Sequence, residues 1–381
     1  MARLARVELF APCEIAIVHV MNRVVRRCFL LGNDPVSGKN FDHRKIWIED
    51  RLRSLSALFG IDLLGFSILS NHFHLILRSR PDVVATWSDA DVARRWLMLC
   101  PYRKQSNGAA EDPSETELNM ICNDPIRLAQ TRTRLSDIGW WMRLLCQKIA
   151  VRANKEDGEV GKFFQSRYRA VRLCDEEAIL ACSAYVDLNP IRAKLATTIE
   201  ESDFTSVQRR FERLNNSTIT SERTYKEEPT NHDRPAIKKE SVSKPLVASK
   251  VLNDATPDGF LSPITIDEFR DALGANPSST GMRCSEKGFL PMTTIDYLQL
   301  LEWTARQVVP GKRGSTPDAT PGILDRLSIN ANTWLPLVTK FGKLFNNVAG
   351  RPRVIDSTRS RIHQRRFNLR REARELLETE V

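Results

Sequence analysis

The feature that most constrains the fold is a pair of apolar, β-rich runs joined by a tight polar turn. The runs are IDLLGFSILS (residues 61–70) and NHFHLILRSRPD (residues 71–82). Two such runs in direct succession predict neighbouring antiparallel strands. Successive side chains of a strand point to opposite faces, so His72 and His74 share one face while Phe73 and Leu75 point into a core on the other. The chain is therefore expected to contain a sheet with two imidazoles on one side.

The surrounding segments alternate between strand and helix patterns. Strands are predicted at 14–23 and 163–173, and helices at 41–60, 90–100, 134–154 and 175–188, the last with an acid-rich first turn. A polar stretch at 103–117 interrupts them. The order strand, helix, strand, strand, helices, strand, helix predicts an α+β domain with helices packed on an antiparallel sheet.

The composition changes after residue 206. Residues 207–260 are polar, charged and poor in large apolar side chains, which indicates a flexible linker. Residues 261–350 show helical patterns, and residues 351–374 hold nine arginines against Asp356 and Glu372. The expected organisation is a catalytic domain (1–206), a linker (207–260), a helical domain (261–350) and an arginine-rich tail (351–381).

Composition narrows the class of protein. With 381 residues and 41% hydrophobic residues, the chain can bury a sizeable core, and its apolar runs are too short to span a membrane. We read no export signal, and the eight cysteines form no C-x-x-C pair, which favours reduced thiols in the cytoplasm. No phosphate-binding glycine loop is present, so no nucleotide cofactor is expected. The net charge of +10 favours a polyanionic partner, nucleic acid before a membrane surface.

The histidine pair has a chemical and a structural interpretation. Imidazoles at i and i+2 lie about 7 Å apart along a strand and can converge on one divalent ion. Alternatively, they are hydrogen-bonded histidines on a polar sheet face. A histidine-triad hydrolase would need a third histidine at position 76, which is Ile76.

A second group of polar residues lies in AYVDLNP, residues 184–190. Tyr185 and Asn189 are spaced i and i+4, so they share one helix face. Taken singly, Tyr185 could be an ordinary half-buried aromatic residue and Asn189 a helix-terminal residue before Pro190. Their coincidence with the histidine pair is what suggests a site.

Three segments in this order resemble a known family. NHFHLIL (71–77), GKFFQSRYRAVRL (161–173) and AYVDLNPIRAKLA (184–196) are similar to the REP-associated tyrosine transposases. These are single-tyrosine transposases of the His-hydrophobic-His (HUH) nuclease class. The first strand also looks like theirs, and the resemblance covers roughly residues 10–200. The chain departs from the family at Leu69 and Ser70, where Met-Pro is common, and in its polar insertion and long C-terminal region.

The resemblance implies a ferredoxin-like fold that cleaves and rejoins single-stranded DNA beside hairpins. By position, His72, His74 and Asn189 would hold Mg²⁺ or Mn²⁺, and Tyr185 would be the nucleophile. Attack by the tyrosine would give a 5′-phosphotyrosine and a free 3′-hydroxyl. The bond energy is retained in that intermediate, so no ATP is required.

DNA contacts are expected from arginines around the site and in the tail: Arg167, Arg169, Arg365, Arg366, Arg370 and Arg371. Between two of these arginines, Tyr168 is expected either to stack on a base or to pack in the protein. A solvated helix face is the other interpretation of the tail. The expected partner is single-stranded or hairpin DNA, and the expected protein is a monomer or homodimer associated with the nucleoid. Two alternatives stay open: a domesticated hairpin-binding protein that does not cut, and a metal-dependent hydrolase without a covalent step.

Overall fold

A five-stranded sheet forms the centre of the structure, which is a computed structural model describing residues 9–11, 14–25, 28–224, 256–267, 274–308, 324, 329–361 and 367–378. Its strands are β1 (Ile17–Arg23), β2 (Ile61–Ile68), β3 (His72–Ser79), β4 (Arg169–Leu173) and β5 (Val348–Ala349). They lie in the order β2-β3-β1-β4-β5. The predicted α+β class is confirmed.

The pairing of the last strand corrects one prediction. β1 pairs antiparallel with β3 and β4, and β2 pairs antiparallel with β3. The two-residue β5, however, pairs parallel with β4, so the sheet is mixed rather than antiparallel. A strand of this length leaves no alternating pattern in the sequence. β4 is also shorter than predicted, because residues 163–168 precede it as loop.

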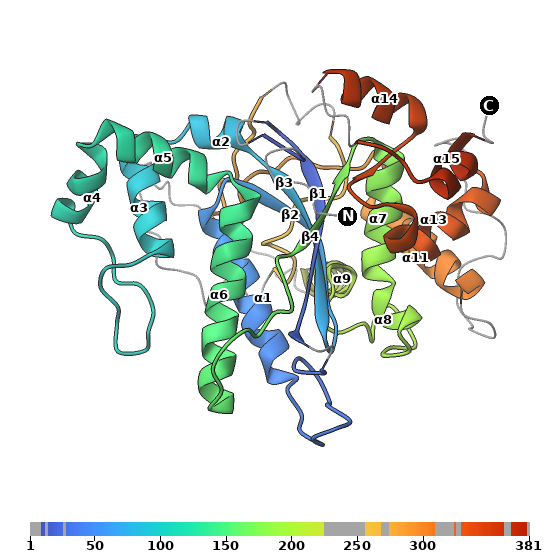
Figure 1. The fold of residues 1–381 in the computed structure, drawn as a ribbon, viewed down its shortest axis with the longest axis horizontal. Coiled ribbons are helices and arrows are strands. Elements are labelled where there is room, and N and C mark those ends of the chain that lie inside the picture. Colours follow the sequence, from blue (N-terminus) through green and yellow to red (C-terminus); the bar gives the residue numbers. More distant parts are fainter. Residues whose placement is uncertain are drawn as a thin grey trace, which may run out of the picture.

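Helices cover both faces of the sheet. They are α1 (His43–Leu58), α2 (Pro81–Ala85), α3 (Asp89–Leu99), α4 (Glu115–Cys122), α5 (Pro125–Leu135), α6 (Ile138–Asp157), α7 (Glu176–Asp187), α8 (Asn189–Arg192), α9 (Ser206–Thr224), α11 (Thr294–Val308), α13 (Ala331–Leu344), α14 (Pro352–Arg361) and α15 (Arg371–Glu378). α1 and α6 lie on one side of the sheet, and α7 lies on the other, with α13 and α11 beyond it (Figure 1). The predicted helices near 41–60, 90–100 and 175–188 are confirmed as α1, α3 and α7.

Strand alternation divides the interior into two cores. On the α1 and α6 side, Val18, Val20 and Leu75 pack against helix side chains such as Trp141. On the other side, residues of β3 and β4 pack against α7, and the same core includes side chains of α11 and α13. The C-terminal helices therefore contribute to the core that covers one face of the sheet.

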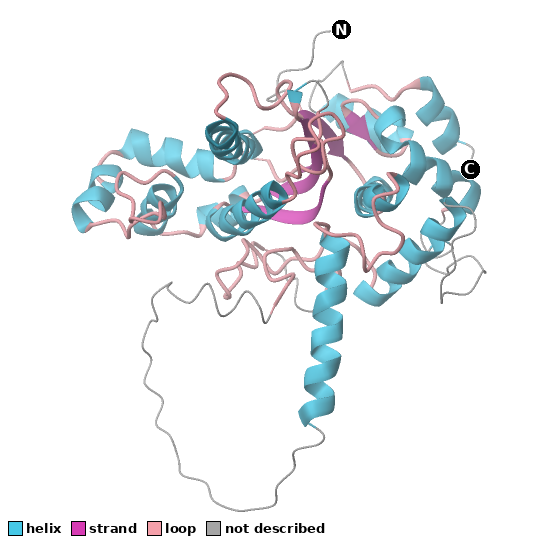
Figure 2. Cartoon of the chain, turned by 90° about the horizontal axis from the view of Figure 1, so that it is seen from below, coloured by secondary structure: helices cyan, strands magenta, loops and turns pink. Residues whose placement is uncertain are grey.

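The first part of the predicted linker is helical. α9 begins where the buried carboxylate of Asp187 accepts hydrogen bonds from the Ser206 hydroxyl (2.6 Å) and the Val207 amide (3.1 Å). The other Asp187 oxygen accepts from the Tyr297 hydroxyl at 2.7 Å. This capping from a distant residue is not visible in a composition pattern, which is why sequence predicted a linker here. α9 runs away from the body of the protein (Figure 2), and residues 225–255 lie outside the described ranges.

A buried ion-pair network attaches a C-terminal segment to the sheet. Asp62 of β2 is 1% exposed and accepts from Arg78 Nε at 2.9 Å and Arg80 Nη1 at 3.1 Å. It also accepts from the Ser285 amide at 3.1 Å and the Ser285 hydroxyl at 2.9 Å. Arg78 in turn donates to the Gly288 carbonyl at 2.8 Å. The network joins β2 and β3 to residues more than 200 positions later.

Candidate active site

The register of the sheet places a third histidine on the face of the first two. His74 of β3 lies opposite Met21 of β1, and His72 lies opposite Arg23. Directly paired residues share a face, and alternation then puts His19 on that face as well. Sequence reasoning missed His19. The alternation within β1 does not determine whether His19 lies on the same face of the sheet as His72 and His74. Only the register between β1 and β3 determines this.

The imidazole of His72 is oriented by its neighbour. Its Nδ1 lies 2.6 Å from the side-chain oxygen of Asn71, and an amide oxygen can only accept, so Nδ1 carries the proton. The neutral ring therefore keeps its lone pair on Nε2. Burial and the positive charge of Arg23 lower the pKa of His72 to about 4. The ring is neutral at pH 7, as a metal ligand must be.

His74 is held by His19. His19 Nε2 lies 2.9 Å from His74 Nδ1, and the two rings stack with centroids 5.1 Å apart. His74 Nε2 is buried and has no hydrogen-bond partner among the described residues. Burial lowers the pKa of His19 to about 3, with a further contribution from Arg169. Burial also lowers the pKa of His74, together with the neighbouring His19 and His72.

Tyr185 of α7 lies against this histidine cluster. Its ring centroid is 5.4 Å from that of His74, and the His72 and His74 centroids are 5.0 Å apart. The Arg192 guanidinium carbon lies 4.9 Å from the tyrosine centroid. Burial raises the pKa of the Tyr185 hydroxyl, and the charge of Arg192 opposes that rise. The fold thus brings together two elements that the sequence separates widely.

Asn189 begins α8, one turn after Tyr185. Its Nδ2 is buried and finds no hydrogen-bond partner in the described part of the chain. Rotation of the amide by half a turn exchanges Nδ2 and Oδ1, so an oxygen ligand can occupy the same place. An unsatisfied buried polar atom costs about 1–3 kcal/mol, which a ligand here would recover.

α13 packs over the tyrosine. Phe341 stacks on the Tyr185 ring at 5.6 Å between centroids, and a methyl group added at Gly342 would lie 3.0 Å from the tyrosine oxygen. Arg192 donates to the Thr339 carbonyl of the same helix. The hydroxyl therefore lies beneath a helix of the C-terminal region.

The predicted DNA contacts are dispersed. Arg169 lies opposite Met21 on the histidine face and donates to the Phe345 carbonyl at 2.6 Å. Arg167 is exposed, whereas Tyr168 is 7% exposed and packs in the first core instead of presenting its ring at the surface. In the tail, Arg370 is exposed and donates to the Lys343 carbonyl, and exposed Arg371 pairs with Glu375 at 2.6 Å. Arg365 and Arg366 lie outside the described residues.

The chemistry of the predicted donor groups bears on metal binding. In the part of the chain that the structure describes, no three His, Cys, Asp or Glu side chains gather as a metal site. The predicted set differs in composition, because it combines two histidines with an asparagine. Neutral rings at His72 and His74, the unpartnered Nε2 of His74 and the unpartnered amide of Asn189 are groups of the chemical kind that can bind a divalent ion.

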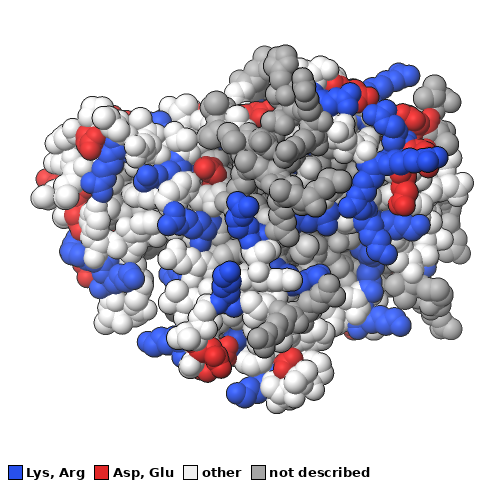
Figure 3. Space-filling model, viewed as in Figure 1, with Lys and Arg blue, Asp and Glu red and all other residues white. Residues whose placement is uncertain are grey.

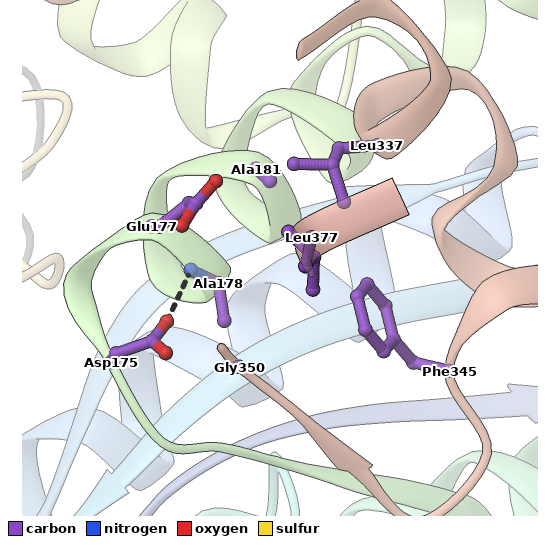
Figure 4. A pocket seen from close by; sticks show the side chains of 8 residues that line it. All are labelled: Asp175, Glu177, Ala178, Ala181, Leu337, Phe345, Gly350 and Leu377. Carbon is purple, nitrogen blue, oxygen red and sulfur yellow. Dashed lines mark hydrogen bonds between the residues drawn. The ribbon is translucent and has the colours of Figure 1, made fainter. Parts of the chain in front are cut away.

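A small pocket lies at the opposite end of α7 (Figure 4). Asp175 and Glu177 line one side, and Leu337, Phe345 and Leu377 of the C-terminal region line the other. The Asp175 carboxylate accepts from the Ala178 amide at 2.9 Å, which caps α7. The Glu177 carboxylate pairs with Arg351 at 2.6 Å. Both carboxylates are therefore engaged within the fold, and the pocket is not part of the candidate site.

Comparisons with known proteins add one distant likeness. No protein-family model matches the chain, and no curated protein matches it. A solved structure of a REP-associated tyrosine transposase bound to a REP hairpin is similar with a TM-score of 0.30 and 10% identity. The match covers 52% of this chain and 80% of that one. No helix within the described ranges combines the length and apolar composition that crossing a membrane requires.

Proposed function

We propose that this chain is a metal-dependent nuclease that attacks DNA with a tyrosine. More specifically, we propose a single-tyrosine transposase of the REP-associated type, with a ferredoxin-like catalytic part in residues 1–206, that cleaves and rejoins single-stranded DNA beside hairpins. The observation that carries the proposal is the convergence of His72, His74 and Tyr185 on one face of the sheet, with ring centroids 5.0 and 5.4 Å apart. A protein that only bound DNA would need none of these three groups at one point.

His72, His74 and Asn189 would hold Mg²⁺ or Mn²⁺, with open positions for phosphate and water. When bound, such an ion polarises the scissile phosphate and stabilises the charge that develops on it. Asn71 keeps the Nε2 lone pair of His72 free for this role. His19 would do the same for His74 by accepting a hydrogen bond from His74 Nδ1–H at its own Nε2.

Tyr185 would form the covalent intermediate. Its oxygen attacks the phosphorus, the bond from phosphorus to the 3′-oxygen breaks, and the 5′-phosphate stays on the tyrosine. The phenol proton passes to solvent, and the departing 3′-oxygen takes up a proton. Because burial raises the pKa of Tyr185, the phenol is protonated at pH 7, and the nearby charge of Arg192 helps the oxyanion to form. No nucleotide is consumed. We expect the protein to act in the cytoplasm on nucleoid DNA, as a monomer or homodimer.

Trapping the intermediate tests this proposal. Incubation with 5′- or 3′-labelled hairpin-flanked single strands and Mn²⁺ should yield an SDS-stable adduct that carries only the DNA 3′ of the cut. Cleavage without an adduct would favour a metal-dependent hydrolase. Binding without cleavage or adduct would favour a domesticated binding protein. Either result would contradict the proposal.

Replacing His19 should weaken metal binding. We expect His19→Phe to lower the Mn²⁺ affinity by about 10- to 100-fold, because the acceptor that fixes the tautomer of His74 is lost. His19→Gln supplies an amide oxygen as acceptor and should retain most of the affinity. Isothermal titration calorimetry of the metal-free proteins measures both. Equal affinities for wild type and His19→Phe would show that His19 does not orient the ligand.

A further inference from the structure

We propose that the surface over α1, the end of α3 and α6 binds the phosphate backbone of a DNA duplex, as the stem of a hairpin would present it. This inference rests on the proposed function, whose hairpin-bearing substrate it places on the protein. The surface, called the α6 basic face, consists of Lys104, Arg134, Arg143, Lys148 and Arg152 together with Arg51, which is partly buried. It lies on the side of the sheet opposite α7, and Lys and Arg side chains are prominent around α6 in Figure 3.

Tryptophans hold several of these cations in place. The guanidinium carbons of Arg134 and Arg143 lie 4.8 and 4.7 Å from the Trp140 ring centroid. The Arg152 guanidinium lies 3.8 Å from the centroid of Trp47. Such contacts fix the direction of side chains that otherwise move freely in solvent, so less entropy is lost when they bind a phosphate.

Electrostatic effects show that the cations act on common neighbours. Burial raises the pKa of the Cys100 thiol, while the charges of Arg51, Arg134 and Arg143 all oppose that rise. Burial lowers the pKa of Lys148, and Arg51, Lys104 and Arg152 lower it further. Arg51 affects both Cys100 and Lys148, so it lies near the cations around each of them. The part of this lowering of the Lys148 pKa that comes from Arg51, Lys104 and Arg152 reflects repulsion between these positive charges and Lys148.

The chain does not neutralise this repulsion. Within the described ranges, none of the six residues forms an ion pair, although Asp50 lies close enough to Arg152 to be stabilised by its charge. Several arginines elsewhere are paired with carboxylates, such as Arg103 with Glu111 at 2.8 Å and Arg132 with Asp89 at 2.7 Å. A set of unpaired and partly immobilised cations is complementary to an external polyanion.

The dimensions and chemistry of the face favour a duplex backbone over exposed bases. Lys148 and Arg152 are one turn apart on α6, about 6 Å along the helix, and share one side of it. One strand of B-DNA presents roughly two phosphates over that length. The rings of Trp140 and Trp47 are already engaged by guanidinium groups, so base stacking is not what this face offers. If the stem binds here, its single-stranded flank must extend around the sheet to reach Tyr185 on the other face.

A matched pair of triple variants tests the proposal. The first, Arg134→Gln/Arg143→Gln/Lys148→Gln, removes three charges from the α6 basic face. The second, Arg94→Gln/Arg103→Gln/Arg213→Gln, removes three charges from arginines that are ion-paired. Fluorescence anisotropy with a labelled DNA hairpin across a salt series gives the slope of log K against log salt. We expect the first variant to lower that slope by about 2.7, since each phosphate contact contributes about 0.9, and the second to leave it near the wild-type value.

Equal slopes for the first variant and wild type would overturn the proposal, as would equal losses in both variants. Preferential loss of binding to phosphatidylserine vesicles, with hairpin binding unchanged, would identify a membrane surface instead. The proposed function has a separate readout, because adduct formation on a single strand without a stem should persist in the first variant. If the wild-type protein formed no adduct, the proposed nuclease function would be contradicted. The salt slopes would still show whether the α6 basic face binds DNA.

Discussion

Replacing Tyr185 with phenylalanine is expected to abolish adduct formation and to lower the rate of single-strand cleavage by at least roughly 10³-fold, because removing a nucleophile eliminates the covalent route. The substitution keeps the ring that stacks on Phe341 and lies under Arg192, so only the hydroxyl is lost. Hairpin binding, measured by anisotropy, should stay within about twofold of wild type.

Tyr102→Phe is the matched control for this experiment. Tyr102 is 54% exposed and follows α3, on the α1 and α6 side of the sheet. Its hydroxyl accepts from Arg127, and the substitution should leave both adduct and cleavage unchanged. If Tyr185→Phe still formed an adduct, another residue would be the nucleophile, and the role proposed for α7 would have to be abandoned.

Removing the carboxylate of Asp62 should have the largest effect on stability. We expect Asp62→Ala to lower the free energy of unfolding by about 3–5 kcal/mol, since it leaves Arg78 and Arg80 buried without their shared counter-charge. Ser285 would lose its acceptor as well, which loosens the attachment of residues 274–288. Urea denaturation followed by circular dichroism measures the change.

Asp112→Ala provides the comparison. Asp112 pairs with Arg94 at 3.5 Å, and its side chain is 73% exposed. Exposed pairs contribute about 0–1 kcal/mol, so this variant should unfold close to wild type. If Asp62→Ala lowered the free energy of unfolding no more than Asp112→Ala does, the buried network would contribute little to stability.

Local patterns predicted much of the central sheet and the helices packed on it. The runs around β2 and β3, the alternation in β1 and the amphipathic segments of α1, α3 and α7 each depend on neighbours within a few residues, so sequence alone predicts them. The break before α6 was not predicted, because the Asp137 cap that starts the helix lies inside a continuous helical pattern. The start of α9 was missed for a similar reason, since its cap comes from Asp187 in a different helix.

The candidate site was predicted only in part. Alternation predicts that His72 and His74 share a face, and helical spacing predicts that Tyr185 and Asn189 do. The contact of His19 with His74 depends on the register of β1 against β3, which alternation within one strand does not determine. The position of α13 over Tyr185 depends on tertiary packing between segments far apart in the chain. Metal binding and the covalent step are both predictions.

The contact between α13 and Tyr185 has a thermodynamic consequence for the proposed reaction. A scissile phosphate that approaches the tyrosine oxygen from the side covered by Gly342 can reach it only in molecules where α13 has moved away. The apparent dissociation constant for a cleavable strand then equals the intrinsic constant divided by the fraction of molecules in that open form. With one open molecule in about a hundred, the measured affinity would be roughly 100-fold weaker than the site allows, and a ligand that holds α13 open would act as an activator.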